Sequence, residues 1–308
     1  FGMCVDSLLA LGETDRVRRT LAYALERYAS HGRVTQQIAP DGRPYNFPGH
    51  ESPDSLAFLL HSIAASGDAQ LIGQHHDFLK LEIERLFAEV ADRRTGLVRR
   101  GLVLAGMRDF AVRDSSCYDN TMLAAIAKHA AKLGLRCPGA SDYGALLVQT
   151  FWTGTHFRDD QASQLLSGDA NVAVFWFGIV KDEKKERALF KSVLAAFKQA
   201  RLDEPYALRY ESVTKGTPMR GLDAFMRGWE RDTVWLHLGN MWLQVLARLD
   251  RKEFATQLAR HRELIERERN YPEVLSKDGR PHRSLFFHAD DSMLWAANFL
   301  ALSKKVRS

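Results

Sequence analysis

The chain has 308 residues, 45% hydrophobic and 26% charged, a composition typical of soluble globular proteins that allows one large core or two smaller ones. Its net charge of +5 is not gathered into a basic run and no nucleic-acid motif occurs, which argues against a nucleic-acid partner. No apolar run approaches the roughly 20 residues of a membrane span, and three cysteines without metal or disulfide spacing suit a reducing compartment. We therefore expect a cytoplasmic protein with no membrane contact.

Apolar residues recur at helical spacing along most of the chain. Val17, Leu21, Leu25 and Tyr28, for example, fall on one face of a predicted helix. The predicted helices cover residues 3–11, 13–28, 53–65, 71–91, 121–133, 143–152, 170–180, 183–200, 232–249, 252–267 and 289–304. Short β-hairpins are expected in the loops at 97–104 and at 270–287, the second with Asp278-Gly279 at its turn.

These helices form a repeating unit in which two helices with a short break between them are followed by a long loop. The first helix of a pair is apolar nearly all round, as at 172–177, whereas the second is amphipathic, as at 183–198. A helix that is apolar all round is buried and an amphipathic one lies outside it. We therefore predict an all-α protein with an inner ring of helices inside an outer ring, forming one domain over residues 1–308. The helix pairs differ too much in sequence for a regular open solenoid.

The last predicted helix is of the inner type and has no outer partner. A closed ring of six pairs needs one more helix, which we expect upstream of Phe1, because the chain begins inside a helical pattern without a start methionine.

The densest group of polar side chains is the segment Arg113-Asp114-Ser115-Ser116-Cys117-Tyr118-Asp119-Asn120, which runs directly into an apolar helix. A polar segment at a helix N-terminus places side chains and free backbone N–H groups around one point. Asp119 can donate a proton there to a glycosidic oxygen. Alternatively, Asp119 or Asn120 can simply cap the helix, and the eight residues alone favour capping.

Three further segments stand out: Gly168-Asp169-Ala170-Asn171 and Tyr271-Pro272-Glu273 in the long loops, and Ser292-Met293-Leu294-Trp295 in the last predicted helix. Together with Tyr118-Asp119-Asn120-Thr121 and the order of helix pairs, they resemble the six-hairpin (α/α)6-barrel glycosidases of the glucoamylase, amylo-1,6-glucosidase and glycoside hydrolase family 63 type. The resemblance covers nearly the whole chain but includes few specific motifs. It implies an (α/α)6 toroid that hydrolyses an α-glycosidic bond by inversion, with Asp119 as general acid and Glu273 as general base, and without a cofactor.

Inverting hydrolysis needs two carboxyl groups about 6.5–9.5 Å apart with a water molecule between the base and the sugar. A sugar also needs aromatic side chains against its apolar faces and polar groups at its hydroxyls. The candidates for substrate binding are His50, Glu51, Asp54, Arg113, Asp114, Tyr118, Phe157, Asp169, Asn171, Trp229, Arg231, Trp235 and His237. Trp235 also falls in the helical pattern of a core face, and each polar residue taken singly has a structural alternative.

Two other hypotheses remain open. A sugar epimerase or a polysaccharide lyase on the same scaffold would depend on proton transfer by His50, His237 or His288. A sugar-binding toroid without catalysis would bind an oligosaccharide and leave it unchanged. No set of His, Asp and Glu residues has metal-ligand spacing, and no glycine-rich loop suits a phosphate, so neither a metal nor a nucleotide is expected.

Overall fold

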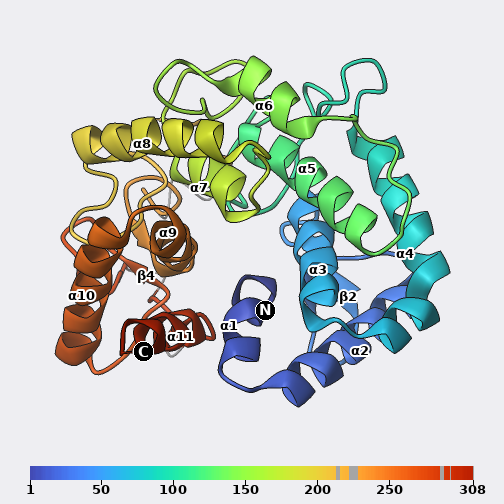
Figure 1. Cartoon of the computed structure of the whole chain (residues 1–308), viewed down its shortest axis with the longest axis horizontal. Helices are drawn as coiled ribbons and strands as arrows, with labels where there is room; N and C mark the ends of the chain where they lie inside the picture. Colours follow the sequence, from blue (N-terminus) through green and yellow to red (C-terminus); the bar gives the residue numbers. More distant parts are fainter. Residues whose placement is uncertain (213–215, 222–227, 285–287, 292, 308) are drawn as a thin grey trace.

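The computed structural model describes residues 1–212, 216–221, 228–284, 288–291 and 293–307. In this part of the chain the protein is mostly helical, with eleven α-helices and two small two-stranded antiparallel sheets (Figure 1). The prediction of a mostly helical protein is therefore confirmed. None of the helices within these ranges is long and apolar enough to cross a membrane.

A short 3-10 helix, η1 (Gly2–Cys4), precedes the first α-helix. The α-helices are α1 (Val5–Ala10), α2 (Thr14–His31), α3 (Pro53–Ser66), α4 (Ala69–Val90), α5 (Cys117–Lys132), α6 (Tyr143–Phe151), α7 (Gly168–Trp176), α8 (Glu183–Ala200), α9 (Leu236–Leu249), α10 (Arg251–Glu268) and α11 (Ala296–Arg307). Each predicted helix has a counterpart, but α5 begins four residues before its predicted start, and α9 and α11 begin later than predicted.

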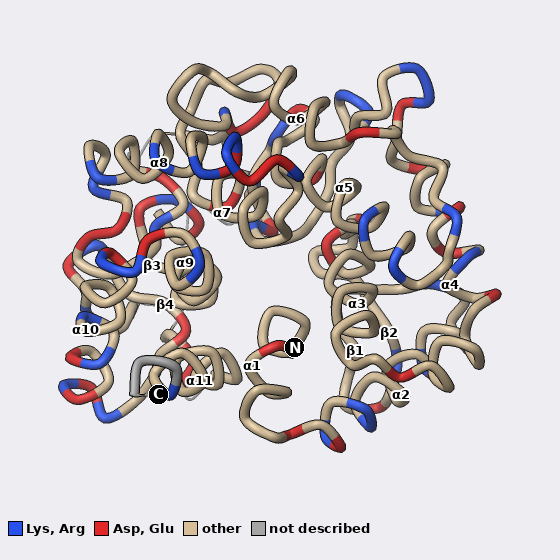
Figure 2. The backbone as a smooth tube through the Cα atoms, in the orientation of Figure 1, with Lys and Arg blue, Asp and Glu red and all other residues tan. Residues whose placement is uncertain are grey.

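Every second helix along the chain, from α1 to α11, contacts the next of that set. Helix α1 contacts α3, and the contacts continue from α3 to α5, α5 to α7, α7 to α9 and α9 to α11, while α11 also contacts α1 (Figure 1). The other helices pack against this set: α2 and α4 against α3, α6 against α5, α8 against α7, and α10 against α9 and α11. Figure 2 shows charged residues repeatedly along α4, α8 and α10.

The pattern of buried residues explains why some helices belong to the set of six contacting helices and others pack against it. Most residues of α5, α7 and α9 are buried, including the polar Asn120, Asn171 and Asn240. Helix α8 instead buries one stripe, which contains Leu189, Phe190, Val193 and Phe197. A buried apolar stripe and a solvated charged face are what hold a helix on the outside of a core.

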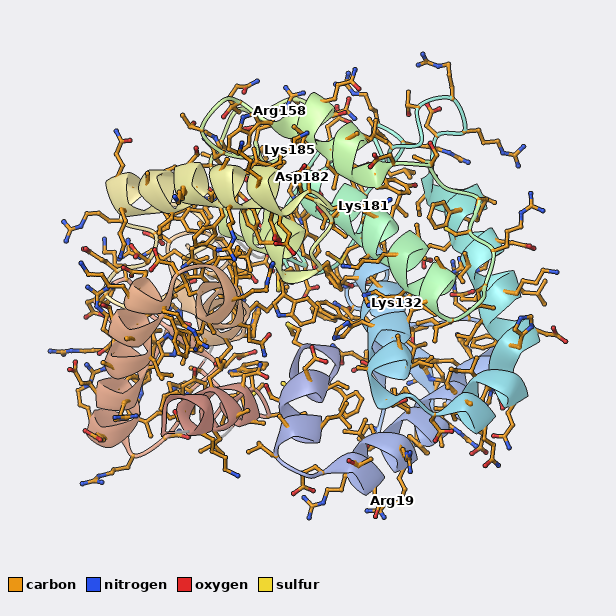
Figure 3. The ribbon with its side chains drawn as sticks, in the orientation of Figure 1. Arg19, Lys132, Arg158, Lys181, Asp182 and Lys185 are labelled. Carbon is orange, nitrogen blue, oxygen red and sulfur yellow. The ribbon has the colours of Figure 1, made fainter. Side chains whose placement is uncertain are left out.

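Local side-chain chemistry sets the ends of helix α8. The Asp182 side chain, at the start of α8 in Figure 3, accepts a hydrogen bond from the backbone N–H of Lys185. This bond satisfies one of the N–H groups left free in the first turn. The helix ends at Arg201, which has a left-handed backbone with φ of 55°.

The strands lie between the helices. β1 (Gln37–Ile38) pairs with β2 (Pro44–Tyr45), and β3 (Val234–Trp235) pairs with β4 (Val274–Leu275). The hairpin predicted at 97–104 is wrong, because Val98 pairs with Ala91 and Leu104 with Glu51 in isolated bridges.

The chain does turn at Asp278-Gly279, as predicted, and Leu275 lies opposite Pro281. Gly279 has φ of 82°, a conformation that favours glycine. Strand β4, however, has its main partner in β3, and residues 285–287 of the predicted hairpin lie outside the described residues.

Candidate active site

A cavity of about 870 Å³ opens among segments that are far apart in the sequence. Residues from α2, α3, the β1–β2 hairpin, the 106–110 loop, the 229–237 segment and the stretch before α11 all line it. Its aromatic residues include Tyr23, Phe47, Phe58, Phe110, Trp229, Trp235 and Trp295, and its carboxyl groups belong to Asp54, Asp109, Glu230, Glu273 and Asp290. Among the lining residues within the described ranges there is no Lys or Arg, although the whole chain is basic.

Asp109 and Glu230 both line this cavity, and the carboxylate of Glu230 binds the backbone of Asp109. The two oxygens of Glu230 accept the backbone N–H groups of Asp109 and Phe110, at 2.8 and 2.9 Å. Glu230 is 5% exposed, and burial raises its pKa to about 7 despite the opposing charge of Arg108. Asp109 is half-buried, and burial raises its pKa to about 6. Glu230 thus fixes the backbone that carries Asp109, whose own carboxyl group remains partly exposed to the cavity.

Glu273 reaches the same cavity from the segment just before β4. Its backbone N–H donates to the carbonyl of Asp290 at 2.8 Å, and its carbonyl accepts the N–H of Leu236 at 3.2 Å, which ties it to the start of α9. Burial, together with the negative charge of Asp290, raises the pKa of Glu273 to about 7. Glu273 is half-buried, so its carboxyl group is both perturbed and accessible.

Asp119 lies in the first turn of α5 and is not among the cavity-lining residues. The N-cap of α5 is Ser116, whose hydroxyl oxygen accepts the N–H of Asp119 at 2.9 Å and donates to its carboxylate at 2.5 Å. The predicted capping by Asp119 or Asn120 is therefore wrong, because the helix begins earlier than its apolar pattern. Burial raises the pKa of Asp119 to about 6, with Arg113 opposing it. The role of Asp119 as proton donor stays a prediction.

A buried group of charged and polar side chains lies next to the cavity and reaches it at Asp54. Arg113, whose side chain is 6% exposed, donates to Asp169 at 2.6 Å and lies 3.6 Å from Asp159. The hydroxyl of Tyr118 donates to Asp54 at 2.9 Å, and Asp54 itself lines the cavity. Only Asp54 among these residues lines the cavity. The other residues of the group contact one another or hold Asp54 in place.

Three other predicted residues do line the cavity. Trp235 donates its indole N–H to the carbonyl of Trp229 at 2.8 Å, so the two rings hold each other in an edge-to-face arrangement. His237 lies 3.0 Å from the hydroxyl of Tyr210, and burial lowers its pKa to about 3. These residues give the cavity an aromatic wall and a neutral imidazole.

The remaining predicted binding residues have protein partners and do not line the cavity. They are His50, Glu51, Arg113, Asp114, Tyr118, Phe157, Asp169, Asn171 and Arg231. Glu51, for example, pairs with Arg33 and Arg85, and Asp114 pairs with Arg100. Arg231 donates to the carbonyl of Thr217, and Asn171 bonds to the backbone of Phe157. In the structure, the polar groups of these residues make contacts between segments of the chain.

Asp109, Glu230, Gln36, Asp290 and Trp295 are not predicted individually as site residues from the sequence. Glu230 lies between two predicted binding residues, Trp229 and Arg231, and Asp109 lies between an arginine and a phenylalanine next to a glycine-containing turn. An acidic residue beside an aromatic one in a long loop was the available signal.

No family model matches this chain, and no curated protein is significantly similar to it. The sites must therefore be judged by their own geometry. Within the described ranges, no group of three or more His, Cys, Asp and Glu residues is arranged to hold a metal ion.

Proposed function

We propose that this protein is a glycoside hydrolase that cleaves an α-glycosidic bond of an uncharged oligosaccharide by inversion. We further propose that its scaffold is an (α/α)6 toroid, with α1, α3, α5, α7, α9 and α11 as the inner helices and α2, α4, α6, α8 and α10 outside them. The ordered contacts among the six inner helices, including that between α11 and α1, support this arrangement. The resemblance of the helix-pair order and of a few short motifs to six-hairpin glycosidases also supports it.

One observation carries the proposed activity: carboxyl groups with pKa values near neutrality share a cavity with several aromatic rings. Burial raises the pKa of Asp109 to about 6 and that of Glu273 to about 7. Groups in this range can hold or release a proton at physiological pH, which is what general acid–base catalysis requires. Aromatic rings such as Trp229 provide flat apolar surfaces that suit the faces of a sugar ring.

We assign the proton donor to Asp109 and, as the resemblance implies, the general base to Glu273. Because the pKa of Glu273, about 7, lies above that of Asp109, about 6, the reactive form with Asp109 protonated and Glu273 ionised is a minority form, most populated between these two pH values. A general acid must come within about 2.6–3.2 Å of the glycosidic oxygen, so its carboxyl group has to face the substrate cavity. Asp109 lines that cavity, whereas Asp119 does not. Glu230 is held by two backbone N–H groups and serves to position the Asp109 segment.

The charge of the cavity weighs against a polysaccharide lyase, whose uronate substrates are anions. Among the described lining residues, five carboxyl groups and no Lys or Arg disfavour such a substrate. An epimerase using His237 is weakened by a different property. Burial lowers the pKa of His237 to about 3, so this imidazole stays neutral and is a poor proton carrier near pH 7.

Hydrolysis of 4-nitrophenyl α-D-glucopyranoside and of a panel of α-linked disaccharides tests the proposal. We expect turnover, and ¹H NMR should show the β-anomer as the first product because inversion changes the configuration. Failure to hydrolyse any α-glycoside of the panel, or release of the α-anomer first, contradicts the proposal. Binding of these sugars without turnover would favour a non-catalytic sugar-binding protein.

Three variants separate the candidate acids and the base. Asp109→Asn and Glu273→Gln should each lower kcat by about 10²–10⁴-fold while the melting temperature stays close to that of the wild type. Asp119→Asn should retain most of the activity. If Asp119→Asn is folded and inactive while Asp109→Asn is active, the proton donor is Asp119 as the sequence predicted.

A further inference from the structure

The Gln36 side chain connects the β1–β2 hairpin to Asp109. Its Nε2 donates to Asp109 Oδ1 at 3.0 Å, and its Oε1 accepts the backbone N–H of Phe47 at 3.1 Å. The backbone N–H of Gln36 donates to the Asn46 side chain at 2.9 Å. Because the amide oxygen faces an N–H donor, the amide can present only its NH₂ group to Asp109. The orientation of Gln36 is thus set by the hairpin.

We propose that Gln36 is a positioning residue that holds Asp109 Oδ1 as a hydrogen-bond acceptor and leaves the acidic proton on Oδ2. This inference rests on the proposed function, in which Asp109 is the proton donor. In a protonated carboxyl group the carbonyl oxygen accepts a hydrogen bond more strongly than the hydroxyl oxygen, so the N–H of Gln36 favours the form in which Oδ1 carries no proton. A general acid gains from such control because its proton must point at the leaving oxygen before the bond breaks.

The same bond acts on the acidity of Asp109. A donor to a carboxylate stabilises the charged form, so Gln36 lowers the pKa of Asp109 while burial raises it. The backbone N–H of Gly106 acts in the same direction as Gln36. Loss of the Gln36 donor should therefore raise the pKa of Asp109 and keep the acid protonated to higher pH.

Other groups around Asp109 come from separate elements and are unchanged by substitution of Gln36. Asp54 on α3, Glu230 before β3 and the buried Tyr210 all interact electrostatically with Asp109. The Phe47 ring also meets the Phe110 ring edge-on, with 5.9 Å between centroids. The hairpin thus contacts the acid segment through the Gln36–Asp109 hydrogen bond and through the Phe47–Phe110 ring contact. A substitution at Gln36 removes that hydrogen bond and also the bond that the Gln36 side chain accepts from the backbone N–H of Phe47.

A direct titration tests the inference without requiring activity. Protein labelled with [4-¹³C]aspartate gives a carboxyl signal for Asp109, identified by its loss in Asp109→Asn. In Gln36→Leu the titration midpoint of that signal should rise by about one pH unit, because one hydrogen bond to the charged form is lost. The neighbouring Gln37→Leu removes the same amide without touching Asp109, so its midpoint should match the wild type. An unchanged midpoint in Gln36→Leu, or an equal rise in both variants, overturns the inference.

Kinetics give the functional consequence. The pH optimum of an acid–base pair lies midway between the two pKa values, so kcat/KM of Gln36→Leu should peak about half a pH unit higher. Gln36→Glu keeps the side-chain shape but replaces the donor with an acceptor, so its optimum should move further in the same direction. Turnover with an unmoved optimum refutes the role of Gln36 while the hydrolase proposal stands. A moved carboxyl titration in a protein without turnover refutes the hydrolase proposal alone.

Discussion

Arg113 offers the sharpest distinction between a residue that binds substrate and one that holds the fold together. Its guanidinium lies against Asp169 and Asp159, which are 0% and 1% exposed. In Arg113→Met, the two carboxyl groups lose their shared cation while a side chain of similar length keeps much of the packing. Breaking a buried ion pair by removing one partner costs about 3–5 kcal/mol. We therefore expect a large loss of stability.

The expected change in melting temperature follows from the size of the chain. Unfolding entropy is about 2.1 cal/mol/K per residue, or about 0.65 kcal/mol/K for 308 residues. A loss of about 4 kcal/mol then lowers the melting temperature by about 6 °C. Calorimetry or circular dichroism measures it. Arg100→Met is the matched control, since Arg100 pairs with Asp114 at the surface and should leave the melting temperature nearly unchanged.

The pH dependence separates lost charge pairing from lost packing. Arg113 helps lower the pKa of Asp169, so its contribution is present above the unfolded pKa of about 3.9 and is lost as the pH falls through the folded value. In Arg113→Met, the positive charge that counteracts the effect of burial on Asp169 is lost, so the pKa of Asp169 in the folded protein rises. The variant then loses stability as the pH rises, so its deficit should be largest near pH 7 and smaller near pH 4.

Two results would refute this reasoning. A deficit that is equal at pH 4 and pH 7 would mean that packing, not charge, is lost. A variant as stable as the wild type but unable to bind or hydrolyse sugar would mean that Arg113 contacts the substrate, as predicted from sequence.

Three more predictions address acidity, burial and close backbone approach. Asp290→Asn removes the negative charge that helps raise the pKa of Glu273, so the pH optimum of hydrolysis should move to lower pH; an optimum that rises would contradict this. Burial lowers the pKa of His129 to about 3, so this group should lower the free energy of unfolding of the wild type by at most about 1.4 kcal/mol per pH unit as the pH drops below 6.5. In His129→Leu, the free energy of unfolding measured with urea should depend less on pH in that range. Gly168→Ala would force a methyl group against the carbonyl oxygen of Arg209 at the start of α7, and about 1–3 kcal/mol should be lost; an unchanged urea midpoint would show that α7 shifts freely.

The position of α5 shows where sequence-based prediction of a helix end fails. The apolar pattern begins at Thr121, but the helix begins at Cys117 because the Ser116 hydroxyl can accept an N–H in the first turn. Asp119 is satisfied locally by Ser116, whereas Tyr118 and Asn120 can be helical because they have tertiary partners. Asn120, for example, accepts the N–H of Val98. Those partners lie far away in the sequence, so local propensity alone does not reveal them.

The helices, their alternation between buried and amphipathic faces, and the turn at Asp278-Gly279 can be predicted from the sequence alone, because each depends on periodicity or local turn chemistry. The sequence also pointed to Glu273, Asp54, Trp229, Trp235 and His237, all of which line the cavity.

Which acidic residues share a cavity depends on the fold and cannot be predicted from the sequence. Asp109, Glu230 and Glu273 line one cavity because loops from three distant parts of the chain converge, and burial there raises their pKa values. Asp119 is equally acidic in the sequence but lies behind the wall, 6% exposed. Residue type and spacing carry the chemistry of a carboxyl group, whereas its access to a substrate depends on how separate segments pack.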